Sequence, residues 1–95
     1  MHIISRKALR EFSRRHPDSK TALDSWFRLV KANQFENFSV LREIFPSADK
    51  AGDLTVFNIG GNKYRLIASI HFNRQKLYIR HILTHSEYDR GKWKR

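Results

Sequence analysis

Alternation of apolar and polar side chains is the clearest pattern in the sequence. From Tyr64 to Phe72 every second residue is apolar, and the same spacing returns over residues 77–83, where only His81 interrupts it. Period-two alternation predicts strands with one oily face and one polar face. Turns at Gly60-Gly61-Asn62 and Asn73-Arg74-Gln75 bound these strands, and a shorter strand over residues 55–59 precedes them. We therefore predict a three-stranded antiparallel meander.

The register of the last two strands decides which side chains share a face. A two-residue loop at residues 74–75 pairs His71 with Tyr78 and Arg65 with Thr84. The face with these residues is basic and on the solvent side, and it comprises Arg65, Ile67, Ser69, His71, Tyr78, Arg80, Ile82 and Thr84. The opposite, apolar face then carries Leu83 and also His81, which we expect to be a buried, hydrogen-bonded core histidine.

Apolar residues at helical spacing precede the meander. Ser5 is suited to cap a helix over residues 6–16, which a proline ends. Asp18 or Ser19 is suited to cap a second helix that reaches about Lys31. The apolar stripe of this second helix is expected in the core and consists of Leu23, Trp26, Phe27 and Val30.

Shorter elements complete the predicted order. Residues 2–4 form a short strand, residues 39–45 a short helix, and residues 46–54 a polar loop. The predicted fold is α+β: a small antiparallel sheet, made of the C-terminal meander and the N-terminal strand, is covered on one face by a helical hairpin. The other face is expected to be open.

Size and composition point to one domain over residues 1–95, since 40% hydrophobic residues are ample for a single core. Cysteine is absent, which excludes disulfides and thiolate metal sites. No apolar run approaches the about 20 residues that span a bilayer, and the N-terminus lacks the apolar region of a signal peptide. We expect a cytoplasmic protein without membrane contact.

Charge is unevenly distributed along the chain. The net charge is +10, with five basic and one acidic residue over residues 1–16, and nine basic and two acidic residues over residues 60–95. The middle of the chain is nearly neutral. A surplus confined to particular segments favours an anionic partner, most often nucleic acid or the ribosome.

The basic face supplies the candidate functional residues. Arg65 and Arg80 lie on neighbouring strands, where guanidinium groups suit phosphate oxygens. His85 and Tyr88 are three residues apart, so a helical start brings them together. The expected RNA-binding residues are Asn58, Lys63, His71, Tyr78 and Lys92. For each, the alternative is a solvated or locally packed side chain; for Trp93, the alternatives are stacking on a base and a disordered end.

A metal site and a nucleotide cofactor are not expected. The histidines lack the spacing of a ligand set, and Glu87 and Asp89 are the only carboxylates near the basic face. Gly60-Gly61 joins two strands and precedes no helix, unlike a phosphate-binding loop.

Two segments, VFNIGGNKYRLIASIHF and KLYIRHILTHSEYD, resemble the HigB toxins, which are similar to the wider RelE group. The resemblance extends over the whole chain, including the MHIISRKAL opening and the FPSAD loop. It implies an α+β mRNA interferase fold, cleavage of mRNA on the translating ribosome, and neutralisation by a HigA-type helix-turn-helix antitoxin. DNA contact is then only indirect, through the antitoxin.

The resemblance also assigns roles to residues. Arg65 resembles the phosphate-binding arginine of the middle strand and Arg80 a basic residue of the last strand. His85, Tyr88 and Lys92 resemble the C-terminal residues that complete the site. Lys50 and Lys63 are the only counterparts of the lysines that RelE carries before its sheet, so the general base stays open.

The chemistry that fits these residues is attack by the 2′-hydroxyl of the substrate on the adjacent phosphorus. His85 is the candidate proton carrier, because histidine titrates near neutral pH. Tyr88 is suited to donate a hydrogen bond, stack on a base or act as base. The alternatives are a non-catalytic RNA- or ribosome-binding module and a DNA-binding domain; the latter lacks a helix rich in base-reading residues.

Overall fold

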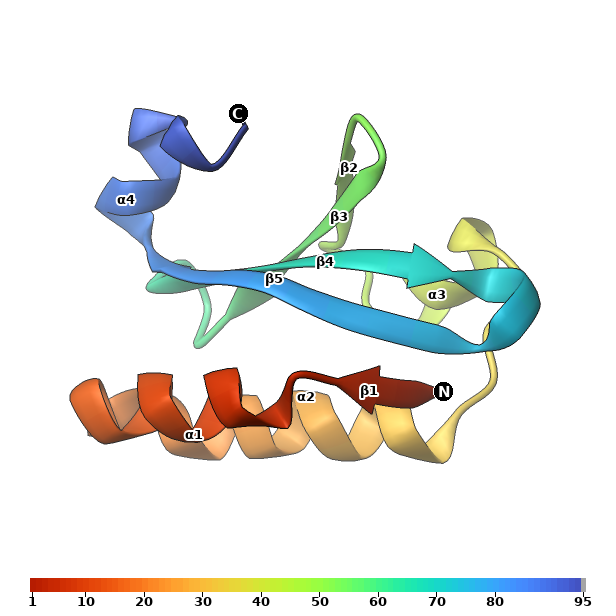
Figure 1. Ribbon diagram of the computed structural model, residues 1–95, viewed down its shortest axis with the longest axis horizontal. Coiled ribbons are helices and arrows are strands. Elements are labelled where there is room, and N and C mark those ends of the chain that lie inside the picture. Colours follow the sequence, from red (N-terminus) through yellow and green to blue (C-terminus); the bar gives the residue numbers. More distant parts are fainter. Residues whose placement is uncertain (95) are drawn as a thin grey trace.

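The sheet of this protein is mixed and has five strands. The structure is a computed structural model that describes residues 1–94, and it confirms the predicted α+β fold. The strand order is β1-β5-β4-β3-β2 (Figure 1). The strands span His2–Ile4 (β1), Asp49–Ala51 (β2), Leu54–Ile59 (β3), Tyr64–His71 (β4) and Lys76–Thr84 (β5).

The predicted meander of β3, β4 and β5 is antiparallel, as expected. Two features of the sheet differ from the sequence prediction. The N-terminal strand β1 runs parallel to β5 at the edge of the sheet. The strand β2 lies within the segment predicted as a loop, where it pairs with β3.

Two helices cover one face of the sheet, as the predicted helical hairpin requires (Figure 1). They are α1 (Arg6–Arg15) and α2 (Lys20–Ala32), joined by the 3-10 turn η1 (Pro17–Ser19). Their apolar stripes pack on the strands in the main core, whose buried members include Phe12, Leu23, Trp26, Val30, Phe57, Leu66, Leu77 and Ile79. The helical spacing of apolar residues in the sequence therefore arises because these residues pack against the sheet.

The predicted helix caps are wrong at two positions. Ser5 has a left-handed backbone (φ 77°), and its side chain makes no capping hydrogen bond. Ser19 caps no amide either, because its hydroxyl donates to the backbone carbonyl of His16, just before η1, at 2.7 Å. By contrast, Asn37 caps α3 (Phe38–Ile44), since its side-chain oxygen accepts a hydrogen bond from the Val40 amide at 3.0 Å.

The predicted register of β4 and β5 is also wrong. Ser69 pairs with Tyr78, so the connection is longer than two residues. It consists of the 3-10 turn η2 (Phe72–Arg74) and Gln75, which has a left-handed backbone (φ 53°). The Gln75 side chain accepts a hydrogen bond from the Phe35 amide at 3.1 Å and donates one to the Phe35 carbonyl at 2.6 Å. These tertiary hydrogen bonds stabilise the longer turn.

A β-bulge in β5 alters which residues share a face. Ala68 pairs with Ile79, but the preceding residue, Ile67, pairs with His81. Arg80 is therefore the extra residue on β5. Because side chains alternate along a strand, one inserted residue reverses the facing of everything beyond it.

Four facing predictions are wrong beyond this bulge, and one of them concerns Thr84, which pairs with Tyr64 and not with Arg65. His81 is exposed and shares the face of Arg65, so it is not a core histidine. Leu83 also lies on that face, opposite Arg65. Ile82, which was predicted on the basic face, packs against the main core instead.

The C-terminal segment covers part of the sheet face that was predicted to be open. We call this face, which is turned away from α1 and α2, the distal face; its strand residues include Val56, Asn58, Arg65, Ile67, Ser69, His71, Tyr78, Arg80, His81 and Leu83. Helix α4 (His85–Arg90) and the 3-10 turn η3 (Lys92–Lys94) lie on this side (Figure 1).

Trp93 holds the C-terminal segment on the distal face. It is 6% exposed and forms a second hydrophobic cluster with Val56 and Ile67. Neither sequence hypothesis for Trp93 is correct, because its ring is packed against the protein. Within residues 1–94, no helix is long and apolar enough to cross a membrane.

Candidate functional site

Arg65 places a cation on the distal face, where it is 8% exposed. It pairs across the sheet with Asn58 of β3. Its guanidinium donates a hydrogen bond to the Tyr64 carbonyl at 3.1 Å and lies 5.4 Å from the centre of the Tyr88 ring. No carboxylate of residues 1–94 forms an ion pair with it. Since a buried charge needs a partner, this guanidinium is suited to bind an anion from outside the protein.

Helix α4 begins where β5 ends, which fixes its position against the sheet. Thr84, which was predicted to pair with Arg65, pairs with Tyr64 and caps α4. Its hydroxyl accepts a hydrogen bond from the Glu87 amide at 3.2 Å, while the Glu87 carboxylate accepts one from the Thr84 amide at 2.9 Å. That hydrogen bond from the Thr84 amide is the main reason why the pKa of Glu87 is lowered.

His85 is the first residue of α4 and forms a side-chain pair with Asp89, one helical turn later. Its Nδ1 lies 2.9 Å from a carboxylate oxygen of Asp89, and both side chains are about half exposed. A carboxylate beside Nδ1 favours a proton on that nitrogen and leaves Nε2 for a substrate. The His85 amide also donates to the Lys63 carbonyl at 3.0 Å, which ties the helix start to the glycine turn.

Asp89 is the residue that sequence reasoning missed as a partner of His85. Their spacing of four residues is the signal that would have found it, because residues i and i+4 are neighbours on a helix. The sequence analysis predicted only a helical start after residue 84, whereas α4 continues to Arg90.

Tyr88 connects Arg65 with the C-terminal turn. Its ring stacks on Trp93, with centroids 5.1 Å apart and planes 12° apart. The indole nitrogen of Trp93 donates to the Tyr88 carbonyl at 3.0 Å. Because this ring is already packed, the hydroxyl is the part of Tyr88 that is suited to act on a substrate.

A second group of predicted residues lies further along β5. The rings of His71 and Tyr78 meet edge to face with centroids 5.4 Å apart, and the Arg80 guanidinium lies 5.4 Å from the centre of the Tyr78 ring. Arg80 precedes Leu83, the partner of Arg65, by three residues, or about 10 Å of strand. The structure thus separates the two arginines into two neighbouring sites.

Lys63 is engaged in a tertiary ion pair. Its ammonium lies 3.3 Å from Asp18, which also accepts a hydrogen bond from the Tyr64 hydroxyl at 2.7 Å. The Tyr64 hydrogen bond, and then Lys63, lower the pKa of Asp18, while the pKa of Tyr64 is raised because its neutral hydroxyl donates to the carboxylate. Asn58 and Lys92 are exposed.

These groups together suit chemistry at a phosphate. Arg65 supplies positive charge, His85 with Asp89 supplies a proton carrier, and Tyr88 supplies a phenol whose ring packs against the guanidinium. Among the residues that the structure describes, no three histidine or carboxylate side chains gather in a way that would hold a metal ion.

Comparison with known proteins is consistent with this chemistry. Residues 19–91 match the family described as HigB_toxin, RelE-like toxic component of a toxin-antitoxin system. The chain is 39% identical over 92 residues to the mRNA interferase toxin HigB of Escherichia coli (strain K12), covering 94% of this chain and 88% of that protein. The mRNA interferase HigB of Shigella flexneri matches to the same extent. The mRNA interferase HigB of Escherichia coli O6:H1 is 36% identical over 93 residues, or 95% of this chain and 90% of that protein.

Proposed function

The chain belongs to the HigB family of RelE-like toxins, and we propose that it is an endoribonuclease that cleaves mRNA on the translating ribosome without a metal ion. The observation that carries this proposal is the buried guanidinium of Arg65 under Tyr88, on the face that also holds α4 with the His85 and Asp89 pair. A buried cation needs an anion, and a phosphate group of RNA supplies one.

In the proposed reaction, the 2′-oxygen of one nucleotide forms a bond to the adjacent phosphorus. The bond between that phosphorus and the 5′-oxygen of the next nucleotide breaks. Tyr88, reacting as its phenolate, takes the proton of the attacking 2′-hydroxyl and becomes the neutral phenol, and Arg65 neutralises the charge that grows on the non-bridging oxygens. His85 donates a proton from Nε2 to the leaving 5′-oxygen, while Asp89 stabilises the imidazolium. The products are a 2′,3′-cyclic phosphate and a free 5′-hydroxyl.

The second group of residues binds RNA away from the reacting phosphate in this proposal. His71, Tyr78 and Arg80 form a continuous aromatic and cationic surface, which suits the stacking of an unpaired base and a phosphate contact. Asn58 and Lys92 are exposed and are proposed to contact the message or ribosomal RNA. Lys63 must exchange its pairing with Asp18 for a phosphate if it binds RNA.

A toxin of this family has an antitoxin partner. We propose a HigA-type helix-turn-helix antitoxin, through which alone the complex contacts DNA. The proposed location is the cytoplasm, where ribosomes and messages are found, with residues 1–95 acting as one domain and requiring no cofactor.

The decisive experiment is cleavage of a message on translating ribosomes in the presence of EDTA, with polyamine keeping the ribosomes intact. We expect cleavage to continue and to leave 2′,3′-cyclic phosphate or 3′-phosphate ends. The matched control is a divalent-dependent nuclease, which EDTA must inhibit under the same conditions. Wild-type protein that binds ribosomes but leaves the message uncut at every codon would overturn the enzymatic proposal.

The second candidate function is a non-catalytic RNA- or ribosome-binding module. The surface of His71, Tyr78 and Arg80 favours it, because stacking and cationic groups bind RNA without cleaving it. The same experiment separates the two functions. Ribosome binding without strand scission is the result expected of the module alone.

A further inference from the structure

Asp18 joins the helical layer to the start of β4. It lies in η1, between α1 and α2, and its carboxylate accepts a hydrogen bond from the Tyr64 hydroxyl at 2.7 Å and pairs with the Lys63 ammonium at 3.3 Å. These two partners are consecutive residues, 45 and 46 positions later in the chain. One carboxylate therefore restrains both side chains that flank a single peptide group.

The backbone carbonyls of the same two residues bind two members of the candidate site. The Lys63 carbonyl accepts a hydrogen bond from the His85 amide at 3.0 Å, at the first residue of α4. The Tyr64 carbonyl accepts one from the Arg65 guanidinium at 3.1 Å. The position of Lys63 and Tyr64 thus sets where α4 begins and how the buried guanidinium is oriented.

The turn before β4 gives this segment little restraint of its own. Gly60 and Gly61 both have left-handed backbones, and a Cβ at Gly61 would meet nothing within 4 Å. Glycines in open space leave the backbone free to move. The Tyr64 ring packs edge to face on Phe12, with centroids 5.2 Å apart, and its hydroxyl reaches Asp18. The segment is therefore anchored from the helical layer.

We propose that Asp18 is a positioning residue for RNA cleavage, which holds Arg65 and His85 in reactive geometry through the carbonyls of residues 63 and 64. This proposal rests on the proposed function, because it concerns the rate of that reaction. Asp18 belongs to the helical layer, on the side of the sheet opposite α4 (Figure 1). A displacement of about 1 Å at a reacting centre costs up to about 10²-fold in rate, so a contact across the sheet is sufficient.

The rival interpretation is that Asp18 contributes to folding alone. The side chains of Asp18 and Lys63 are 51% and 68% exposed, and ion pairs at such exposure add little stability. The Tyr64 ring keeps its packing against Phe12 when its hydroxyl loses this partner. Replacement of Asp18 should therefore leave a folded protein whose cleavage rate can be measured.

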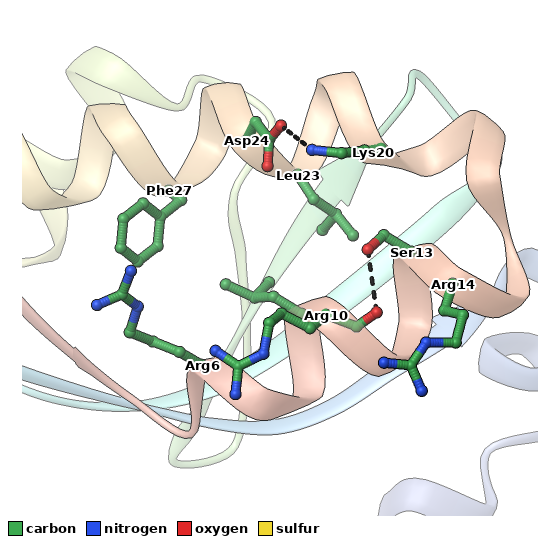
Figure 2. Close-up of a pocket in the computed structure, with 9 residues that line it drawn as sticks. Arg6, Arg10, Ser13, Arg14, Lys20, Leu23, Asp24 and Phe27 are labelled. Carbon is green, nitrogen blue, oxygen red and sulfur yellow. Dashed lines mark hydrogen bonds and ion pairs between the residues drawn. The ribbon is translucent and has the colours of Figure 1, made fainter.

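The test compares full-length Asp18→Ala with a matched control, Asp24→Ala. Asp24 pairs with Lys20 at 2.9 Å and is 57% exposed, and this ion pair is local to α2 (Figure 2). Each variant thus loses one half-exposed carboxylate that pairs with a lysine. The values of kcat and KM for cleavage of a message on ribosomes are measured at a temperature where circular dichroism shows each protein folded.

We expect Asp18→Ala to lower kcat at least about tenfold without raising KM, because the reacting groups are displaced while Lys63 becomes free to bind a phosphate. The control should keep the kcat of the wild type. Three results would each overturn the proposal: an unchanged kcat in folded Asp18→Ala, a raised KM with unchanged kcat, and an equal loss in the control.

Amide hydrogen exchange tests the route through the backbone without any cleavage. The His85 amide should exchange at least about tenfold faster in Asp18→Ala than in the wild type, because its hydrogen bond to the Lys63 carbonyl opens more often. The control should exchange like the wild type. An unchanged rate in Asp18→Ala overturns the route.

The two measurements separate this inference from the proposed function. A wild type that cleaves, with Asp18→Ala cleaving equally fast, leaves the function in place and removes the role of Asp18. A wild type that never cleaves overturns the proposed function and, with it, the role of Asp18 in cleavage; faster exchange of the His85 amide in Asp18→Ala would then show a structural link alone.

Discussion

The guanidinium of Arg65 lies 5.4 Å from the centre of the Tyr88 ring, and 8% of Arg65 is exposed. A cation over an aromatic ring gains about 0.5–2 kcal/mol, which is less than a paired carboxylate would supply at a desolvated site. The site therefore keeps a strong preference for an anion. Substitution of either Arg65 or Tyr88 is therefore expected to change anion binding at this site.

Replacing Arg65 should abolish cleavage without unfolding the protein, provided that its volume is retained. We expect Arg65→Met to lower the rate by about 10²–10³, the usual cost of losing one contact to a developing oxyanion. Its thermal midpoint should stay near that of the wild type, because methionine fills the space against Tyr88. Arg65→Ala should also lower that midpoint, since Arg65 is buried. Full activity of folded Arg65→Met would remove Arg65 from the mechanism.

Asp89 should act on the rate through His85. We expect His85→Ala to lower kcat by about 10²–10⁴, the range for general acid-base catalysis, and Asp89→Asn to lower kcat by a smaller factor with KM unchanged. The reason is the 2.9 Å contact that holds Nδ1. Asp53→Asn, in an exposed turn, is the matched control. An unchanged kcat for Asp89→Asn would contradict this role.

The Asp18 and Tyr64 hydrogen bond should give the free energy of unfolding a dependence on pH at both extremes. The pKa of Asp18 is lowered from 3.8, so its contribution is present above pH 3.8 and is lost as the pH falls through the lower folded value. The pKa of Tyr64 is raised from 10.0, so its contribution is present below pH 10.0 and is lost as the pH rises through the higher folded value.

Urea unfolding of the wild type, Asp18→Asn and Tyr64→Phe between pH 2 and 11 checks this expectation. The wild type should be more stable than Tyr64→Phe between about pH 4 and 10, and the difference should shrink outside that window. A difference that is constant over the whole range would mean that the pair has no influence on the titration of either group.

Trp93 should support both stability and cleavage. Its ring is 6% exposed and stacks on Tyr88, so Trp93→Ala removes packing from the second cluster. We expect a loss of up to about 3–5 kcal/mol in the free energy of unfolding, as for other buried aromatic residues, together with slower cleavage because Tyr88 is no longer held. Trp93→Phe should retain most of both. Wild-type kinetics in Trp93→Ala would show that Tyr88 does not depend on this stack.

The sequence predicted the residues of the candidate site better than it predicted their arrangement. Arg65, His85 and Tyr88 were chosen from the sequence, and the structure places Arg65 against Tyr88. The burial of Arg65 and the pairing of His85 with Asp89 were not foreseen, because both depend on α4. Only a short helical start was expected there, and short helices are stabilised by tertiary contacts more than by their own sequence.

The sequence by itself determined the two long helices and the strands of the meander. Their apolar residues recur at 3.6 or 2 positions, and such periodicity is written into neighbouring residues, whatever the rest of the chain does. The Gly60-Gly61 turn is equally local, since both glycines have positive φ values (63° and 69°) that other residues rarely adopt.

Only the tertiary structure decided the facing of β5 and the closure over Arg65. The turn before β5 depends on Gln75 bonding to Phe35, which is 40 residues earlier in the chain, and the bulge at Arg80 then turns His81 to the distal face. Trp93 likewise finds its place on Val56 and Ile67, far from it in sequence. Contacts between distant residues leave no periodic trace along the chain, and the bulge reverses every facing beyond it.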